Sequence, residues 1–491
     1  MSSPSRYVAL PHAQESLAEL YAQLDELVLS DDEDGVGTSA GAAQQAAASD
    51  AAASPERLAP RHLSVGSEHK YGTRKAFLTI IKSFVATGVM FLPGSFRNAG
   101  LLAAVLTISL VGALSLYGMN LLILTRTHLE GRVVVDAGSA LVGAPGSGAG
   151  EVTTFAQVGK SAFGTWGRRL VDTSILFSQF GFCCVYICFV GNTLSRAVAS
   201  FGFVGPPLWV YMVLTVPVIA PLALIRHLKS FAWPNLVATA VICVSLVYVS
   251  AVAAAAIADP ARAGARDWSC GADRAQSACL VVDARTYPLF LGSACYVFEG
   301  ITMIMPVRNS MRAPETLPRL LGIAMGVCTA LFLVFGTVNL LAYAQDTRPI
   351  IISNLPRTGA LIITLGFVLV AVFMFPLMAF PAAHIVEKKL FGKIRHSGYK
   401  WHKNAIRVGI VVGCVAVSVL AGEKVDKLVA LIGGLFCVPL AMVYPPLFYL
   451  KVGAATDFWR HKVPAALTMV FGCCATLLST IVAVRTFNDE A

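Results

Sequence analysis

Long apolar runs constrain this chain more than any other feature. From residue 75 onward there are eleven of them, each close to the roughly 20 residues that a helix needs to cross a bilayer. They cover residues 75–100, 101–125, 170–190, 208–225, 236–257, 288–307, 320–343, 360–384, 405–420, 428–450 and 463–484. Because lipid offers the backbone no hydrogen-bond partners, every run is expected to be helical. The sequence therefore predicts an all-α membrane protein with eleven transmembrane helices, embedded in the lipid bilayer over residues 71–491.

Residues 1–70 have a different composition, rich in Ala, Ser and Gly and interrupted by the acidic run from Asp31 to Asp34. Such a segment cannot bury enough apolar surface to fold, so it is predicted to be a disordered cytosolic tail. Ser30 and Ser54 are candidate phosphorylation sites, which makes a kinase or a cytosolic signalling partner a candidate partner of this tail. The simpler alternative is a plain disordered segment.

The basic residues lie between the apolar runs and predict the orientation of the chain. The net charge is +10, but its carriers alternate with membrane spans, so no nucleic acid partner is expected. Connections on one side, such as 126–169, 308–319, 388–403 and 451–462, are richer in Lys and Arg than those on the other. Since this excess marks the cytosolic side, the N-terminus is predicted to be cytosolic. An odd number of spans then places the C-terminus on the far, lumenal side.

Ten of the twelve cysteines lie in apolar runs without the spacing of a zinc site and are interpreted as small apolar residues. The other two, Cys270 and Cys279, share one polar loop that falls on the far side. In an oxidising lumen they would form a disulfide bond; the alternative is two free thiols.

Two of the runs carry residues that disfavour a continuous helix. The first contains Gly88 and Pro93, and the sixth contains Gly300 and Pro306. Interrupted spans at corresponding places of two halves indicate a transporter's substrate site at the interface between repeats. We therefore predict a five-plus-five inverted repeat (LeuT-like) with broken helices 1 and 6, and an appended eleventh span. The alternative is that Gly and Pro are merely common in membrane helices.

An unwound segment exposes main-chain groups that suit a zwitterionic amino acid. Free N–H groups at the start of a half-helix favour a carboxylate, and free carbonyls at the end of the other half-helix suit an ammonium group. The predicted substrate-binding residues are those at the two breaks and one aromatic residue of the third span: Thr87, Gly88, Val89, Met90, Phe298, Glu299, Gly300, Ile301 and Tyr186. Phe298 and Tyr186 are expected to shape the pocket for the substrate's side chain.

Glu299 is the sharpest single candidate because an acid at mid-membrane is costly and marks a functional site. Burial favours its protonated form, which suits proton exchange; the alternative is a hydrogen-bonded latch that holds the broken helix.

The eighth run has no Ser, Thr or Asn between Leu365 and Glu387, which disfavours sodium as the coupling ion and leaves protons or uncoupled transport. No cofactor or metal is expected. Lys82, in the first run, is expected to extend to the interface or to pair with a carboxylate.

These segments resemble the signatures of the amino acid/auxin permease family, most of all the fungal vacuolar neutral amino-acid exporters and the lysosomal proton-assisted amino acid transporters. The residues that carry the resemblance read KSFVATGVMFLP from Lys82, FRNAGL from Phe96, FEGI from Phe298 and ISNLP from Ile352. It covers about residues 75–485 and implies eleven spans, a vacuolar membrane, and export of small neutral amino acids from lumen to cytosol. Arg308 and Ala86 depart from the usual pattern, which puts substrate preference in doubt.

The sequence thus favours a secondary active transporter, proton-linked or facilitative, and not an enzyme. The alternative from a different class is an amino-acid sensor that signals through its cytosolic tail. An ion channel is disfavoured because no filter-like segment or ring-forming charge is found.

Overall fold

The computed structural model describes residues 72–139, 154–225, 232–259, 280–391, 400–453 and 457–488. The predicted tail of residues 1–70 and the loop with Cys270 and Cys279 lie outside the described residues, so both stay predictions. The ten cysteines within the described residues are free thiols.

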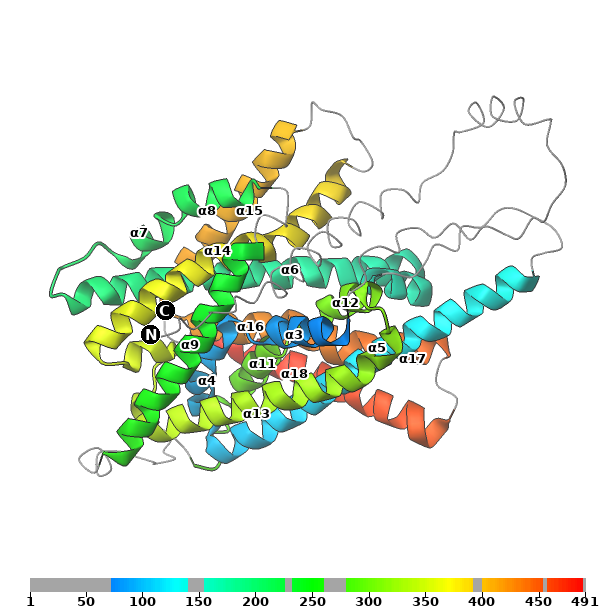
Figure 1. The fold of residues 1–491 in the computed structure, drawn as a ribbon, viewed down its shortest axis with the longest axis horizontal. Coiled ribbons are helices and arrows are strands. Elements are labelled where there is room, and N and C mark those ends of the chain that lie inside the picture. The colour runs from blue at the N-terminus through cyan, green and yellow to red at the C-terminus, as the bar shows by residue number, and fades with distance from the viewer. Residues whose placement is uncertain are drawn as a thin grey trace, which may run out of the picture.

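The described elements that build the bundle are helical (Figure 1). In chain order they are α3 (Thr73–Phe84), η1 (Thr87–Phe91), α4 (Leu92–Ala99), α5 (Leu101–Ser139), α6 (Phe155–Ser200), α7 (Leu208–Val213), α8 (Val216–Ala223), α9 (Ala232–Ala258), α11 (Tyr287–Val297), η3 (Ile301–Met303), α12 (Ile304–Ser310), η4 (Pro314–Thr316), α13 (Leu317–Tyr343), η5 (Ala344–Asp346), η6 (Ile351–Asn354), α14 (Arg357–Phe391), α15 (Lys400–Ala421), α16 (Val425–Ile432), η8 (Gly433–Cys437), η9 (Pro439–Val443), α17 (Tyr444–Val452), η10 (Phe458–Lys462) and α18 (Val463–Asn488).

Ten helical stretches in the described part of the chain are long and apolar enough to cross a membrane. The fourth predicted span differs from them, because it consists of the two short helices α7 and α8 within Leu208–Ala223. At about 1.5 Å per residue this stretch is shorter than the roughly 30 Å hydrocarbon core. The count of eleven spans therefore stays a prediction, whereas the helical membrane architecture is confirmed.

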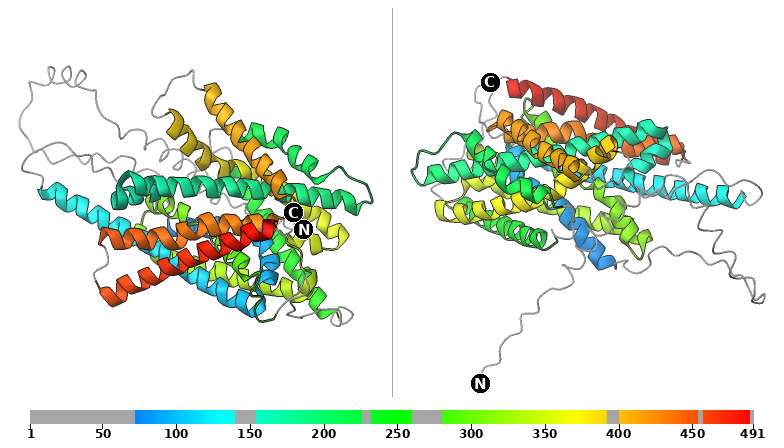
Figure 2. Two further views of the ribbon diagram at one scale, coloured as in Figure 1. Left: turned by 180° about the vertical axis from the view of Figure 1, so that it is seen from behind. Right: turned by 90° about the horizontal axis from the view of Figure 1, so that it is seen from above.

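The helices pack in two groups. In one, α4 and α11 lie together, and α13 packs against α3, α4 and α5. In the other, α6, α8 and α9 pack around α14, and α15 covers α6 and α8. Figure 1 shows α5 and α13 side by side, with the end of α5 projecting past its neighbours. Figure 2 shows the last helix, α18, on the outside of the bundle, where it packs on α16 and α17.

Glycines let the sixth and tenth spans approach closely. A β-carbon on Gly433 would overlap the carbonyl group of Gly292, and one on Gly292 would overlap the carbonyl group of Ala430. Small residues at helix contacts are what allows close packing within a membrane. The tenth span is also distorted here, since η8 and η9 are π-helical. The α11 helix, which leads into the second break, therefore lies in backbone contact with the tenth span.

Candidate functional site

The first span is broken where α3 ends. Its backbone becomes extended at Ala86 (φ −115°, ψ −173°), and the chain then continues as the 3-10 helix η1 into α4, with Pro93 in the first turn of α4. The break was predicted, but its place was wrong: residues Thr87 to Met90 are not unwound, and the extended backbone lies just before them. Proline lacks an N–H group and cannot continue an α-helical bond pattern, which fits a tighter 3-10 turn ahead of Pro93.

The second break lies where it was predicted, between Phe298 and Ile301. The α11 helix ends at Val297, and Gly300 (φ −170°, ψ −1°) leads into η3 and then α12. The two breaks touch each other. A β-carbon at Gly88 would lie 3.1 Å from Cε1 of Tyr296, and one at Gly300 would overlap the ring of Phe84. An aromatic ring from the other span therefore crowds each of the two glycines.

A cavity opens between the two breaks and the third and eighth spans. About 390 Å³ of space there is filled by no atom, a volume that includes open solvent at its mouth. It is lined by Ser83, Phe84, Ala86, Thr87, Gly88, Phe182, Tyr186, Tyr296, Val297, Glu299 and Met378. The wall is mostly aromatic and apolar, with a small number of polar groups, which is the usual character of a small-molecule site.

Four of the nine predicted site residues line this cavity: Thr87, Gly88, Tyr186 and Glu299. The other five, Val89, Met90, Phe298, Gly300 and Ile301, do not. The expectation that Phe298 shapes the pocket is not supported, because its ring is buried and packs on Phe332 of α13 at a centroid distance of 5.2 Å.

The aromatic residue that faces the cavity from α11 is Tyr296, whose ring meets Phe182 edge-on at 4.7 Å. Sequence reasoning missed Tyr296, Phe182 and Met378. The available signal for Tyr296 was a polar aromatic residue in the last helical turn before the break.

Glu299 is partly exposed to the cavity, and it is the one ionisable carboxylate among the lining residues. Its Oε1 accepts a hydrogen bond of 3.2 Å from the Thr302 hydroxyl, three residues further along the same span. This geometry is compatible with both interpretations of Glu299, since a local bond helps to hold the broken helix while the cavity side stays accessible.

Two other charged residues near the breaks have partners away from the cavity. Lys82 donates from Nζ to the carbonyl oxygen of Asn235 in α9 at 3.3 Å. This contact with a backbone oxygen differs from the expected carboxylate pair. Arg308 points to α5, where both of its Nη atoms lie 3.0 Å from the carboxylate oxygens of Glu130. Arg308 is therefore no part of the cavity wall.

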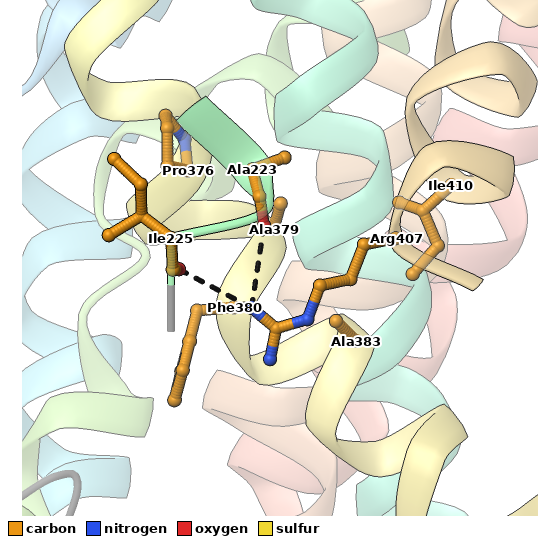
Figure 3. A pocket seen from close by; sticks show the side chains of 8 residues that line it. All are labelled: Ala223, Ile225, Pro376, Ala379, Phe380, Ala383, Arg407 and Ile410. Carbon is orange, nitrogen blue, oxygen red and sulfur yellow. Dashed lines mark hydrogen bonds between the residues drawn. The ribbon is translucent and has the colours of Figure 1, made fainter. Parts of the chain in front are cut away.

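A second cavity lies between α8, α14 and α15, at a place where side chains connect these three helices (Figure 3). Its single charged lining residue, Arg407, donates from Nη1 to the carbonyl oxygens of Ala223 and Ile225 at 3.4 and 3.3 Å. Its Nε donates to Oε1 of Glu387 at 2.8 Å, and the Phe380 ring lies 5.7 Å from the guanidinium carbon. The guanidinium thus ties the end of α8 to α14 and α15.

Comparisons with known proteins agree on one family. The family model described as "Transmembrane amino acid transporter protein" matches residues 69–487. Vacuolar amino acid transporter 4 of Saccharomyces cerevisiae is 29% identical over 86% of this chain and 59% of its own length. Vacuolar amino acid transporter 3 of Schizosaccharomyces pombe is 30% identical over 83% of this chain and 57% of its own length. The chain thus spans less than two thirds of these two relatives.

A plant relative is covered more completely. Amino acid transporter AVT3A of Arabidopsis thaliana is 28% identical over 87% of this chain and 91% of its own length. Among solved structures, the inward-facing conformation of Mhp1 has a TM-score of 0.53 with 15% sequence identity, and covers 86% of this chain and 92% of that chain. The structural likeness concerns the fold alone.

Proposed function

The chain belongs to the transmembrane amino acid transporter family, and we propose that it carries neutral amino acids across a vacuolar membrane by alternating access. The observation that carries the proposal is the cavity bounded by both broken spans, with Glu299 as its one carboxylate. The main-chain groups at the breaks hold the substrate's carboxylate and ammonium groups, because half-helix ends leave backbone donors and acceptors free.

The lining disfavours an acidic side chain on the substrate. No Lys or Arg is among the lining residues, so an acidic side chain would have no counter-charge in a low-dielectric site. The rings of Phe182, Tyr186 and Tyr296 offer apolar contact to a side chain.

Glu299 is the proposed proton carrier. It faces the cavity at membrane depth, where an ionisable group can take up a proton on one side and release it on the other. The names of the fungal relatives support a vacuolar membrane, and the distribution of Lys and Arg supports a cytosolic N-terminus and a lumenal C-terminus. Since a vacuolar lumen is acidic, proton-linked movement would run from lumen to cytosol.

The test is uptake of a mixture of radiolabelled L-amino acids by proteoliposomes, with and without a proton gradient. We expect gradient-dependent uptake of neutral amino acids by the wild type. Glu299→Gln keeps the shape of the side chain and removes its proton exchange, so gradient dependence is expected to vanish. The matched control is Glu315→Gln, which changes an exposed glutamate in η4 and should transport normally.

Two outcomes would contradict the proposal. Gradient-dependent uptake that survives Glu299→Gln would limit Glu299 to a structural role. Binding of amino acids without any uptake by the wild type would favour the sensor.

A further inference from the structure

A cluster of charged side chains joins α5 to α12 outside the cavity. Glu130, in α5, accepts a bond of 2.7 Å from Nε of Arg126 at its Oε1. From α12, Arg308 donates from Nη1 to Oε1 and from Nη2 to Oε2, both at 3.0 Å. The guanidinium fork of Arg308 thus meets both oxygens of one carboxylate, which is the strongest geometry for such a pair.

The second guanidinium group contacts the same short helix. The Arg126 side chain is only 5% exposed. Its Nη1 donates to Oδ1 of Asn309 and lies 3.5 Å from the sulfur of Met305. Met305 and Asn309 are four residues apart and therefore share one face of α12. Two arginines and one carboxylate hold this face against α5.

The α12 helix needs such external support. It has seven residues, and an isolated helix of this length is not stable by itself. It is separated from α11 by the irregular backbone at Gly300 and by η3. Glu299 lies only five residues before its first residue, Ile304. A shift or rotation of α12 is therefore transmitted through η3 to the carboxylate in the cavity.

We propose that Glu130 is a positioning residue, which fixes α12 on α5 and thereby sets the place of Glu299 at the cavity. The inference rests on the proposed role of Glu299 in transport. Glu130 itself does not line the cavity. Its effect is exerted through Arg308 and α12, so it needs no contact with substrate.

The test compares Glu130→Gln with a charge swap, Glu130→Arg together with Arg308→Glu. Glu130→Gln removes the carboxylate that Arg126 and Arg308 share. We expect uptake of the radiolabelled L-amino acid mixture to fall by roughly tenfold, which corresponds to about 1.4 kcal/mol and lies within the range of coupling energies between contacting residues. The swap again gives two guanidinium groups and one carboxylate, so it should recover most of the uptake. Asp172→Asn is the matched control, because the Arg168–Asp172 pair (3.5 Å, each about a third exposed) joins two residues of the same helix, α6.

A second readout separates positioning from plain stability. In detergent, the unfolding temperature of each variant is measured with and without the same amino-acid mixture. A positioning role predicts that Glu130→Gln loses most of the rise caused by amino acids and that the swap restores it. Normal uptake by Glu130→Gln, or a folded swap that stays inactive, overturns the inference. The inference is also overturned if Glu130→Gln has a lower unfolding temperature but amino acids raise that temperature as much as they do in the wild type. If the wild type itself shows no uptake, the proposed function has failed instead.

Discussion

The ring of Tyr296, in the sixth span, packs on Gly88 of the first span. The two broken spans thus meet where an aromatic side chain covers a residue without a side chain. Gly88 is not among the described glycines with positive φ. Glycine is therefore favoured at this position by tight packing, and not by an unusual backbone conformation. The Tyr296 ring also lines the cavity, so anything that displaces it changes the site.

Gly88→Ala should impair transport. The new β-carbon would stand 3.1 Å from Cε1 of Tyr296, and overpacking of this kind costs about 1–3 kcal/mol. Since about 1.4 kcal/mol corresponds to tenfold, uptake by proteoliposomes should drop roughly tenfold. Tyr296→Leu removes the crowded ring but also a wall of the cavity, so the double variant with Gly88→Ala should lose less uptake than the two single losses combined predict. A Gly88→Ala variant with full activity would contradict the packing argument.

Arg97→Met should loosen α4, the second half of the broken first span. Nη1 of Arg97 donates to the carbonyl oxygen of Thr347 at 2.6 Å, which ties α4 to the segment between α13 and α14. Without this bond, a cysteine introduced at Thr87 should react faster with an impermeant maleimide added on the side that bears residues 344–356. Arg348→Met, which changes an exposed neighbour, is the control. Equal labelling rates in both variants would show that the bond from Arg97 to Thr347 does not hold α4 in place.

Glu387→Gln should destabilise the fold more than it changes transport. Its partner Arg407 is 8% exposed in its side chain, and removing one member of a buried pair costs about 3–5 kcal/mol. We expect a clearly lower unfolding temperature in detergent, with an unchanged rise on addition of amino acids. A loss of that rise at unchanged stability would point to a role in substrate binding instead.

Gly433→Ala should prevent normal folding. Its β-carbon would overlap the backbone carbonyl of Gly292, which cannot rotate away as a side chain can. The yield of monodisperse protein in size-exclusion chromatography measures the effect. Gly409→Ala is the matched control, since nothing lies within 4 Å of a β-carbon at that exposed helical position. There the substitution should be neutral or slightly stabilising, because alanine favours helix.

The architecture was accessible from the sequence because hydrophobic length and the Gly and Pro residues are local signals. They predicted membrane helices, a break in each of the first and sixth spans with the place of the second correct, and four residues that line the cavity, Thr87, Gly88, Tyr186 and Glu299. The register around each break was not accessible. Whether Phe298 or Tyr296 faces the cavity depends on the rotation of the chain at the end of α11, which the packing of α11 on α16 and of Phe298 on α13 decides.

Long-range partners were equally hidden. Arg308 was interpreted as a departure that affects substrate preference, whereas its partner is Glu130, 178 residues earlier in the chain. Lys82 was expected to extend to the interface or to pair with a carboxylate, and its Nζ donates to the main-chain oxygen of Asn235 in α9. A pairing of this kind follows from how helices are juxtaposed, and no spacing within one helix encodes it.

The contact between Gly292 and Gly433 has a consequence for divergence within this fold. Because the two backbones touch here, a larger residue at either glycine would force the sixth and tenth spans apart. Stepwise substitution at these two positions is therefore disfavoured. The cavity wall is built differently, from rings and flexible side chains such as Phe182, Tyr296 and Met378. Single substitutions there alter the shape of the space while the frame stays intact. Substrate range can therefore drift among descendants of one ancestor long before the architecture does.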